Sequence, residues 1–214
     1  MNPCINSLVF ISRNPMLLKR LHSAMLQVSN TNSKSIYELL RKHGYNDKDA
    51  TLLADKRDYI SDVDKVVTAK LDIFYFSAET ISAWVPNLLP IVTMLREKYN
   101  DSIRLVAQST EEGNSIYNTN DISGLFFPDK FKVDFCCNGA YETEFFESWS
   151  SLIDYLGNHF EKANINPYYT MEEIREAVDE AYDDGDSEYF FNINVYTPYD
   201  NSNFYSCEYS LEVA

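Results

Sequence analysis

Acidic side chains gather between residues 172 and 188, and Arg175 is the one basic residue among them. The capping box Thr170-x-x-Glu173 predicts that this block opens as a helix running to about Tyr182. Acids three and four positions apart then share one side of the helix, where like charges repel. Such a surface can imitate the phosphates of a nucleic acid and bind a basic groove. The candidate partner-binding residues are Glu172, Glu173, Glu176, Asp179, Glu180, Asp183, Asp184, Asp186 and Glu188.

The same block has two other interpretations. An acidic stripe is also typical of a solvated helix face that only keeps a protein in solution. Calcium binding is the second interpretation. In a calcium loop with Gly185 as its glycine, the last position needs a bidentate acid, but that position is Phe191. We therefore expect no metal site and no cofactor here.

Nucleophilic chemistry would need one of the four cysteines beside His22, His43 or His159. No histidine lies in a recognisable motif, and His22 and His43 fall in helices rich in Lys and Leu, where surface positions are ordinary. Cys136 and Cys137 are adjacent in a strand and are expected to pack as small hydrophobic residues. The sequence contains no zinc-ligand spacing, phosphate loop or dinucleotide fingerprint, so it proposes no catalytic residue.

The formal net charge of −15 is unevenly distributed along the chain. Residues 1–70 contain 11 basic and 7 acidic residues, whereas residues 133–214 contain 2 basic and 18 acidic residues. Such a chain is a poor candidate for nonspecific nucleic-acid binding, which needs the opposite sign. No apolar run is long enough to cross a bilayer and no signal peptide is visible, so we expect a cytoplasmic protein with free thiols.

The middle of the chain should hold the elements that organise the fold. Residues 71–76 are apolar on both faces, which is typical of a central strand. Residues 86–99 carry apolar side chains at three- and four-residue spacing and predict a helix with a proline in its first turn. Further strands are predicted at residues 103–109 and 131–137.

The N-terminal part predicts a strand over residues 4–12 and a helix capped by Asn14. Ser35-x-x-Glu38 is a second capping box, and residues 29–60 read as an inserted helical segment. An edge strand is expected within residues 59–67.

The C-terminal part predicts a helix that begins after Ser148 and ends at Gly157. Beyond the acidic helix, apolar and polar residues alternate over residues 191–195 and again over residues 205–213. This alternation predicts a β-hairpin with one apolar face.

Several short motifs follow one another in order between residues 1 and 157. They are Asn2-x-Cys4-x-Asn6-x-Leu8, Thr80…Trp84-Val85-Pro86, Lys98-Tyr99, Glu112-Gly113, Gly124 and Tyr141-x-Thr143. In this order and spacing the chain resembles the YubB-like ferredoxin-like domain family of bacterial plasmids and phages. It departs from that pattern by lacking a tryptophan before the first cysteine and by adding a C-terminal segment. The resemblance implies a ferredoxin-like fold and a mobile-element origin, and it implies no catalytic residue.

These observations together predict an α+β protein. We expect a ferredoxin-like antiparallel sheet with packed helices over residues 1–157, with the helical insertion at about 29–60. An extension made of the acidic helix and the hairpin is expected over residues 158–214, and it could lengthen the same sheet.

The favoured function is that of a non-enzymatic interaction or inhibitor protein of a mobile genetic element. Its acidic surface would bind a basic nucleic-acid-handling host protein or nucleoprotein complex, as expected of an anti-restriction or anti-CRISPR protein that mimics nucleic acid. Two alternatives stay open: a small-ligand-binding or hydrolytic enzyme that uses the sheet face, and a homo-oligomeric structural protein. Base stacking on the aromatic residues of the sheet would need basic neighbours that the sequence lacks, so core packing is their simpler role.

Overall fold

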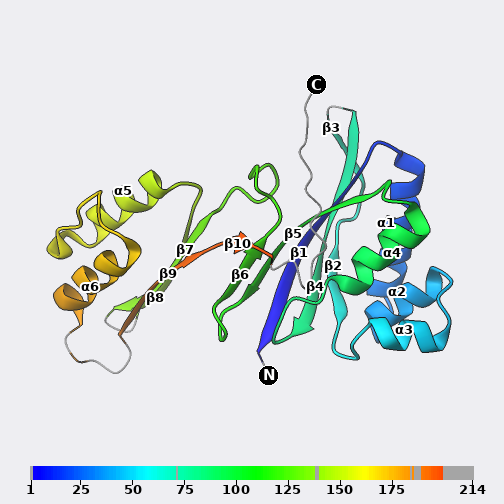
Figure 1. Ribbon diagram of the computed structural model, residues 1–214, viewed down its shortest axis with the longest axis horizontal. Coiled ribbons are helices and arrows are strands. Elements are labelled where there is room, and N and C mark those ends of the chain that lie inside the picture. The colour runs from blue at the N-terminus through cyan, green and yellow to red at the C-terminus, as the bar shows by residue number, and fades with distance from the viewer. Residues whose placement is uncertain (1, 71, 138–139, 184, 186–188, 200–214) are drawn as a thin grey trace. The chain divides into compact units, whose positions relative to one another are not determined.

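The computed structural model shows an α+β fold (Figure 1). Contacts divide the chain into two compact units, which we call the terminal unit (Met1–Asp121 with Pro198–Ala214) and the central unit (Ile122–Thr197). Within the part of the chain that the structure describes, no helix is long and apolar enough to span a bilayer. The described residues are 2–70, 72–137, 140–183, 185 and 189–199.

The terminal unit is built around β1 (Pro3–Ser12), which lies between β4 (Ile73–Ala83) and β5 (Arg104–Glu111) and is antiparallel to both. The strand order of the sheet is β10-β6-β5-β1-β4-β2, with β3 paired to β4. β2 is therefore an edge strand, as predicted. The remaining strands are β2 (Tyr59–Val63), β3 (Thr68–Lys70), β6 (Ile116–Thr119) and β10 (Thr197–Pro198).

The strand β4 is longer than its composition suggested. The prediction ended it at Phe76, but β4 continues to Ala83 because it stays in register with β1, from Ser12 opposite Phe74 to Pro3 opposite Ala83. Its second half contains Ser, Glu and Thr, which give a weak strand signal in isolation. Pairing with β1 stabilises this second half as a strand, although its local propensity is weak.

Four helices belong to the terminal unit: α1 (Pro15–Ser29), α2 (Ile36–Lys42), α3 (Asp47–Leu53) and α4 (Leu89–Tyr99). The predicted caps of the first two are confirmed, since Asn14 accepts a hydrogen bond from the Met16 backbone N–H and Ser35 accepts one from that of Glu38. The start of α4 was predicted wrongly, at residue 86. The residues before Leu89 form a turn instead of a helical first turn.

The core of the terminal unit lies between the sheet and these helices, which cover one face of the sheet in Figure 1. Leu8, Phe10 and Phe76 project from the strands and are buried with Leu18 and Leu21 of α1. The rings of Phe10 and Phe76 stack with centroids 4.9 Å apart. This packing fixes which side chains of each strand face the helices.

The central unit is a three-stranded antiparallel sheet with helices packed against it. β7 (Phe131–Cys137) lies between β8 (Ala140–Phe146) and β9 (Phe190–Val195). Val133 and Phe135 share a core with Leu152 and Ile174 of the two α-helices. The helical elements are α5 (Trp149–His159), the short 3-10 helix η1 (Glu161–Ala163) and α6 (Met171–Tyr182).

The unit boundaries differ from the domain boundary that the sequence analysis placed after residue 157. The contacts divide the chain after Asp121 and again after Thr197. The physical reason is that α5 and α6 bury their apolar faces in one core, together with β7 and β9. The helix α5 also runs through Gly157 to His159, so the predicted stop at this glycine was wrong.

Only the first strand of the predicted C-terminal hairpin falls within the described residues. β9 covers the first alternating segment and pairs with β7. The second segment, Tyr205 to Val213, lies outside the described residues. The hairpin therefore stays a prediction.

Candidate functional site

The helix α6 positions the acidic residues that the sequence singled out. Its capping box is confirmed, because Thr170 Oγ1 accepts a hydrogen bond from the Glu173 backbone N–H and Glu173 Oε2 accepts one from the Thr170 backbone N–H at 2.7 Å. Ile174 and Val178, four residues apart, are fully buried. Burial of this side turns the opposite side of α6 to solvent.

The structure separates the nine predicted residues into groups with different roles. Glu173 is used by the cap, and Asp179 accepts a hydrogen bond of 2.7 Å from the Tyr189 hydroxyl. Glu172 lies 3.5 Å from the Arg175 guanidinium, and Asp183 accepts a hydrogen bond from the Gly185 backbone N–H. Asp184, Asp186 and Glu188 lie outside the described residues.

Glu176 and Glu180 are exposed and, among the residues that the structure describes, have no hydrogen-bond or ion-pair partner. Together with Glu172 and Asp183 they form a row at four- and three-residue spacing, which we call the acidic stripe. At a rise of 1.5 Å per residue, the stripe extends for about 16 Å along the helix. It presents four exposed carboxylates in a line.

The charge of the whole molecule is concentrated around this stripe. Residues 122–197, which make up the central unit, contain 16 acidic and 4 basic residues, a formal charge of −12. The terminal unit contains 17 acidic and 14 basic residues, a formal charge of −3. The negative field that the sequence assigned to its C-terminal part thus belongs mainly to one compact unit.

The acidic stripe lowers the stability of its own helix. Each pair of like charges four residues apart costs roughly 0.2–0.5 kcal/mol. Glu180 and Asp183 also lie at the C-terminal end of α6, where the helix dipole favours cations, and the last turn contains no basic residue. Glu172 lies in the first turn of α6, where the helix dipole favours an acid, but Glu176, Glu180 and Asp183 do not serve the stability of the helix.

A second polar feature, which the sequence analysis did not identify, lies within the terminal unit. On the face of the sheet that packs against the helices, Asn6, Thr80 and Ser109 are cross-strand neighbours and are at most 3% exposed. Ser109 Oγ donates a hydrogen bond of 2.6 Å to Asn6 Oδ1 and lies 2.7 Å from the Tyr199 hydroxyl. Asn6 Nδ2 donates to Ser82 Oγ at 3.2 Å.

The burial of Asn6 could have been predicted from the alternation of side chains along β1. Leu8 and Phe10 face the helices, so Asn6 and Cys4 must lie on the same face. A polar side chain at a core position needs hydrogen-bond partners, and the neighbouring strands supply them. Thr80 Oγ1 is the exception, because it is buried and has no hydrogen-bond partner.

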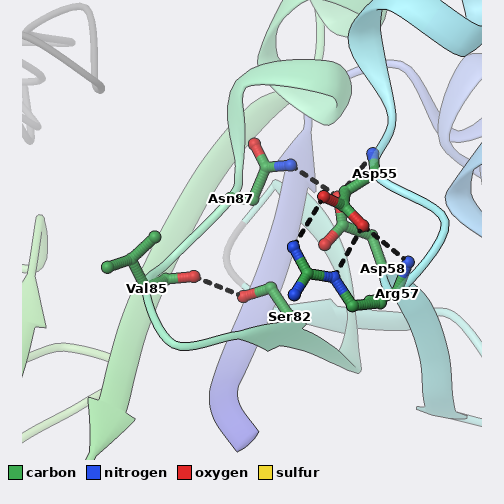
Figure 2. Close-up of polar contacts among 6 residues, drawn as sticks. All are labelled: Asp55, Arg57, Asp58, Ser82, Val85 and Asn87. Atoms are coloured by element: carbon green, nitrogen blue, oxygen red, sulfur yellow. Dashed lines mark hydrogen bonds and ion pairs between the residues drawn. The ribbon is translucent and has the colours of Figure 1, made fainter.

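Asp58, which precedes β2, is a buried carboxylate at the margin of the same sheet (Figure 2). Its Oδ2 accepts hydrogen bonds from Asn87 Nδ2 at 2.5 Å and from the Asp55 backbone N–H at 3.1 Å. Burial raises the pKa of Asp58 to about 6. The Arg57 guanidinium, which belongs to the preceding residue, binds Asp55 at 3.0 Å instead of Asp58.

The turn between β4 and α4 is strained at Trp84. This residue has a φ of 70°, and the Val85 backbone N–H donates to the Ala83 carbonyl at 2.9 Å, which together describe a γ-turn of the rare, strained kind. The Trp84 backbone N–H donates a hydrogen bond to the Asn2 carbonyl, and the Trp84 carbonyl accepts one from Asn114 Nδ2. The turn ends β4, and α4 begins five residues after Trp84, at Leu89.

The structure does not bring a cysteine and a histidine together in the described residues. His22 Nε2 lies 2.7 Å from the Asp64 carbonyl, and the His43 ring bridges the Leu39 carbonyl and the Tyr99 hydroxyl. Both histidines are buried, so the expected surface placement was wrong. Burial raises the pKa of the Cys4 thiol to about 12, which keeps this sulfur protonated and unreactive.

Comparison with protein-family models, with curated proteins and with solved structures gives no match to this chain. Among the residues that the structure describes, no group of three or more His, Cys, Asp or Glu side chains is placed to hold a metal ion. The acidic stripe is thus the candidate site with the most direct support from geometry and charge.

Proposed function

We propose that this chain is a non-enzymatic interaction protein whose central unit binds a basic partner protein through the acidic stripe. The single observation that carries the proposal is that Glu176 and Glu180 are exposed on α6 and have no partner among the residues that the structure describes, within a unit of formal charge −12. Charges that weaken their own helix and meet no partner in the described part of the chain are best explained by an external one.

A basic nucleic-acid-handling protein is the partner class that fits this surface. Such proteins present grooves lined with Lys and Arg that track a line of phosphates. Carboxylates in a row along a helix offer the same sign of charge in a linear arrangement. Inhibition of a restriction or CRISPR-type complex in a bacterial cytoplasm is the concrete form of this proposal.

The fold proposal that accompanies it is a ferredoxin-like terminal unit. Its support is the strand order β5-β1-β4-β2, with α1 to α3 between β1 and β2 and with α4 between β4 and β5. The family resemblance from the sequence motifs adds a plasmid or phage origin to this proposal.

The test is a charge reversal that does not threaten the fold. Glu176→Lys with Glu180→Lys removes two like-charge contacts and places cations nearer the C-terminal end of α6, so the helix should become slightly more stable. The matched control is Asp154→Lys with Glu161→Lys, which changes the charge of the same unit equally at exposed positions outside the stripe.

The readout is capture of partners from a bacterial lysate by each tagged variant, quantified by mass spectrometry. We expect the wild-type protein and the control pair to retain the same basic protein, and the stripe variant to lose it while its thermal unfolding is unchanged or higher. Equal capture by all three variants would refute the role of the stripe.

A further inference from the structure

The strand β8 forms one margin of the sheet in the central unit, and its outer edge is paired with no strand among the described residues. It keeps an unbroken register with β7 from Ala140 to Phe146. Its sequence, AYETEFF, contains no proline and no lysine. Bulges, prolines and charged side chains, lysine above all, are the usual devices that stop an edge strand from accepting another strand, and of these β8 carries only Glu142 and Glu144.

The two faces of β8 differ in chemistry. Tyr141, Thr143 and Phe145 project to the same side as Lys132 and Asp134 of β7, whereas Glu142 and Glu144 project to the other side. Five of the seven side chains are exposed, and Tyr141 and Phe145 are 58% and 48% exposed. The edge thus offers an aromatic row on one side and an acidic row on the other.

Tyr141 and Thr143 of this row are held in place by a buried ion pair. Asp134 Oδ1 lies 3.0 Å from Lys132 Nζ and accepts hydrogen bonds from the Tyr141 hydroxyl at 3.1 Å and from Thr143 Oγ1 at 2.7 Å. The Tyr141 ring also lies 5.8 Å from the Phe190 ring. A large exposed ring whose orientation is already fixed loses little entropy when a partner covers it.

We propose that the free edge of β8 accepts an extended segment of a partner protein, in which basic residues alternate with aliphatic or aromatic residues. Main-chain hydrogen bonds to the edge would supply affinity. Side chains of the added strand would lie about 5 Å from those of β8, with its cations beside Glu142 and Glu144 and its apolar residues beside Tyr141 and Phe145. This inference rests on the proposed function in taking the partner to be basic, but it uses a different surface from the acidic stripe.

A second copy of this chain is a poorer occupant of the edge. If two β8 strands paired with each other, the acidic rows of both copies would lie on one shared edge, where like charges directly opposite are destabilising. A basic segment removes this repulsion, and an acidic or purely apolar segment does not.

The probe for this edge is a capped synthetic peptide of alternating lysine and valine. Hydrogen exchange of the full-length protein should show protection of β8 amides when the peptide is added. Two versions with backbone N-methyl groups at alternate positions test the main-chain bonds, since one of them must lose the donors that face β8 and should bind at least tenfold more weakly. A peptide with four lysines followed by four valines controls for charge alone.

The protein variants separate this inference from the proposed function. Glu142→Lys with Glu144→Lys should weaken binding of the alternating peptide at least tenfold, whereas Glu176→Lys with Glu180→Lys should change it less than threefold. Loss of lysate partners in the stripe variant together with no peptide binding would keep the proposed function and overturn the edge inference. Equal binding of both N-methylated peptides, or a wild-type dimer that Glu142→Gln with Glu144→Gln strengthens by removing the like charges, would overturn it as well.

Discussion

Replacement of Asp58 by asparagine should make the protein more stable at neutral pH. Asp58 is 3% exposed, and among the described residues no ion pair reaches its carboxylate, since Arg57 binds Asp55 instead. Asn87 Nδ2 and the Asp55 backbone N–H both donate their hydrogen bonds to the same carboxylate oxygen, Oδ2. An asparagine can present its amide oxygen to both donors, so the substitution removes the buried charge and keeps the hydrogen bonds.

The magnitude follows from the pKa of Asp58, which burial raises from 3.8 to about 6 in the folded protein. Between these values the folded state binds more protons than the unfolded state, so the free energy of unfolding falls as the pH rises. The penalty is absent below about pH 4 and complete above about pH 6. A difference of about two pKa units corresponds to about 3 kcal/mol at pH 7.

Urea unfolding of Asp58→Asn and wild type at pH 4 and pH 7.5 measures this difference. We expect equal stability at pH 4 and an increase of about 1–3 kcal/mol for the variant at pH 7.5. The control is Asp62→Asn on β2, an exposed carboxylate, whose substitution should change little at either pH. A variant that is less stable than wild type at pH 7.5, or a difference that does not vary with pH, would refute the reasoning.

Three further predictions concern single side chains. Cys4 should resist alkylation by iodoacetamide at pH 8 until the protein is unfolded, because burial raises its pKa to about 12, and labelling at the rate of a free thiol would contradict this. Thr170→Ala should lower the stability of the central unit by about 1 kcal/mol in thermal unfolding, because the capping box is lost, and an unchanged transition would show that the cap contributes nothing. Ser109→Ala should cost about 1–3 kcal/mol in urea unfolding, because the Asn6 amide oxygen and the Tyr199 hydroxyl lose their shared partner, whereas a neutral substitution would show that water replaces it.

Local features of the fold could be predicted from the sequence. Asn14, Ser35 and Thr170 begin their helices as expected, because a cap depends on residues within one turn of each other. The edge position of β2 and the alternation of β7 also follow from patterns a few residues long.

Features that depend on distant residues could not be predicted. The extent of β4 is set by its register with β1, and the turn that ends β4 is held in place by Asn2 and Asn114. The boundary between the two units differs from the predicted one because α5 and α6 share a core. None of these contacts leaves a signal within a short window of sequence.

The candidate site was predicted in part for the same reason. The four exposed carboxylates of the acidic stripe follow from helical spacing alone. The use of Glu173 in a cap could be anticipated, but the hydrogen bond between Asp179 and Tyr189 could not, because it joins α6 to the residue before β9. The burial of Asp58 also depends on residues that are distant in sequence.

The most direct test of the proposed function is the salt dependence of binding between this protein and its purified captured partner. If the acidic stripe meets a basic surface, the affinity should fall steeply as salt is added, and the slope of log affinity against log salt should be smaller for Glu176→Lys with Glu180→Lys than for wild type. An affinity that is independent of salt, or a slope that the stripe variant leaves unchanged, would contradict the account.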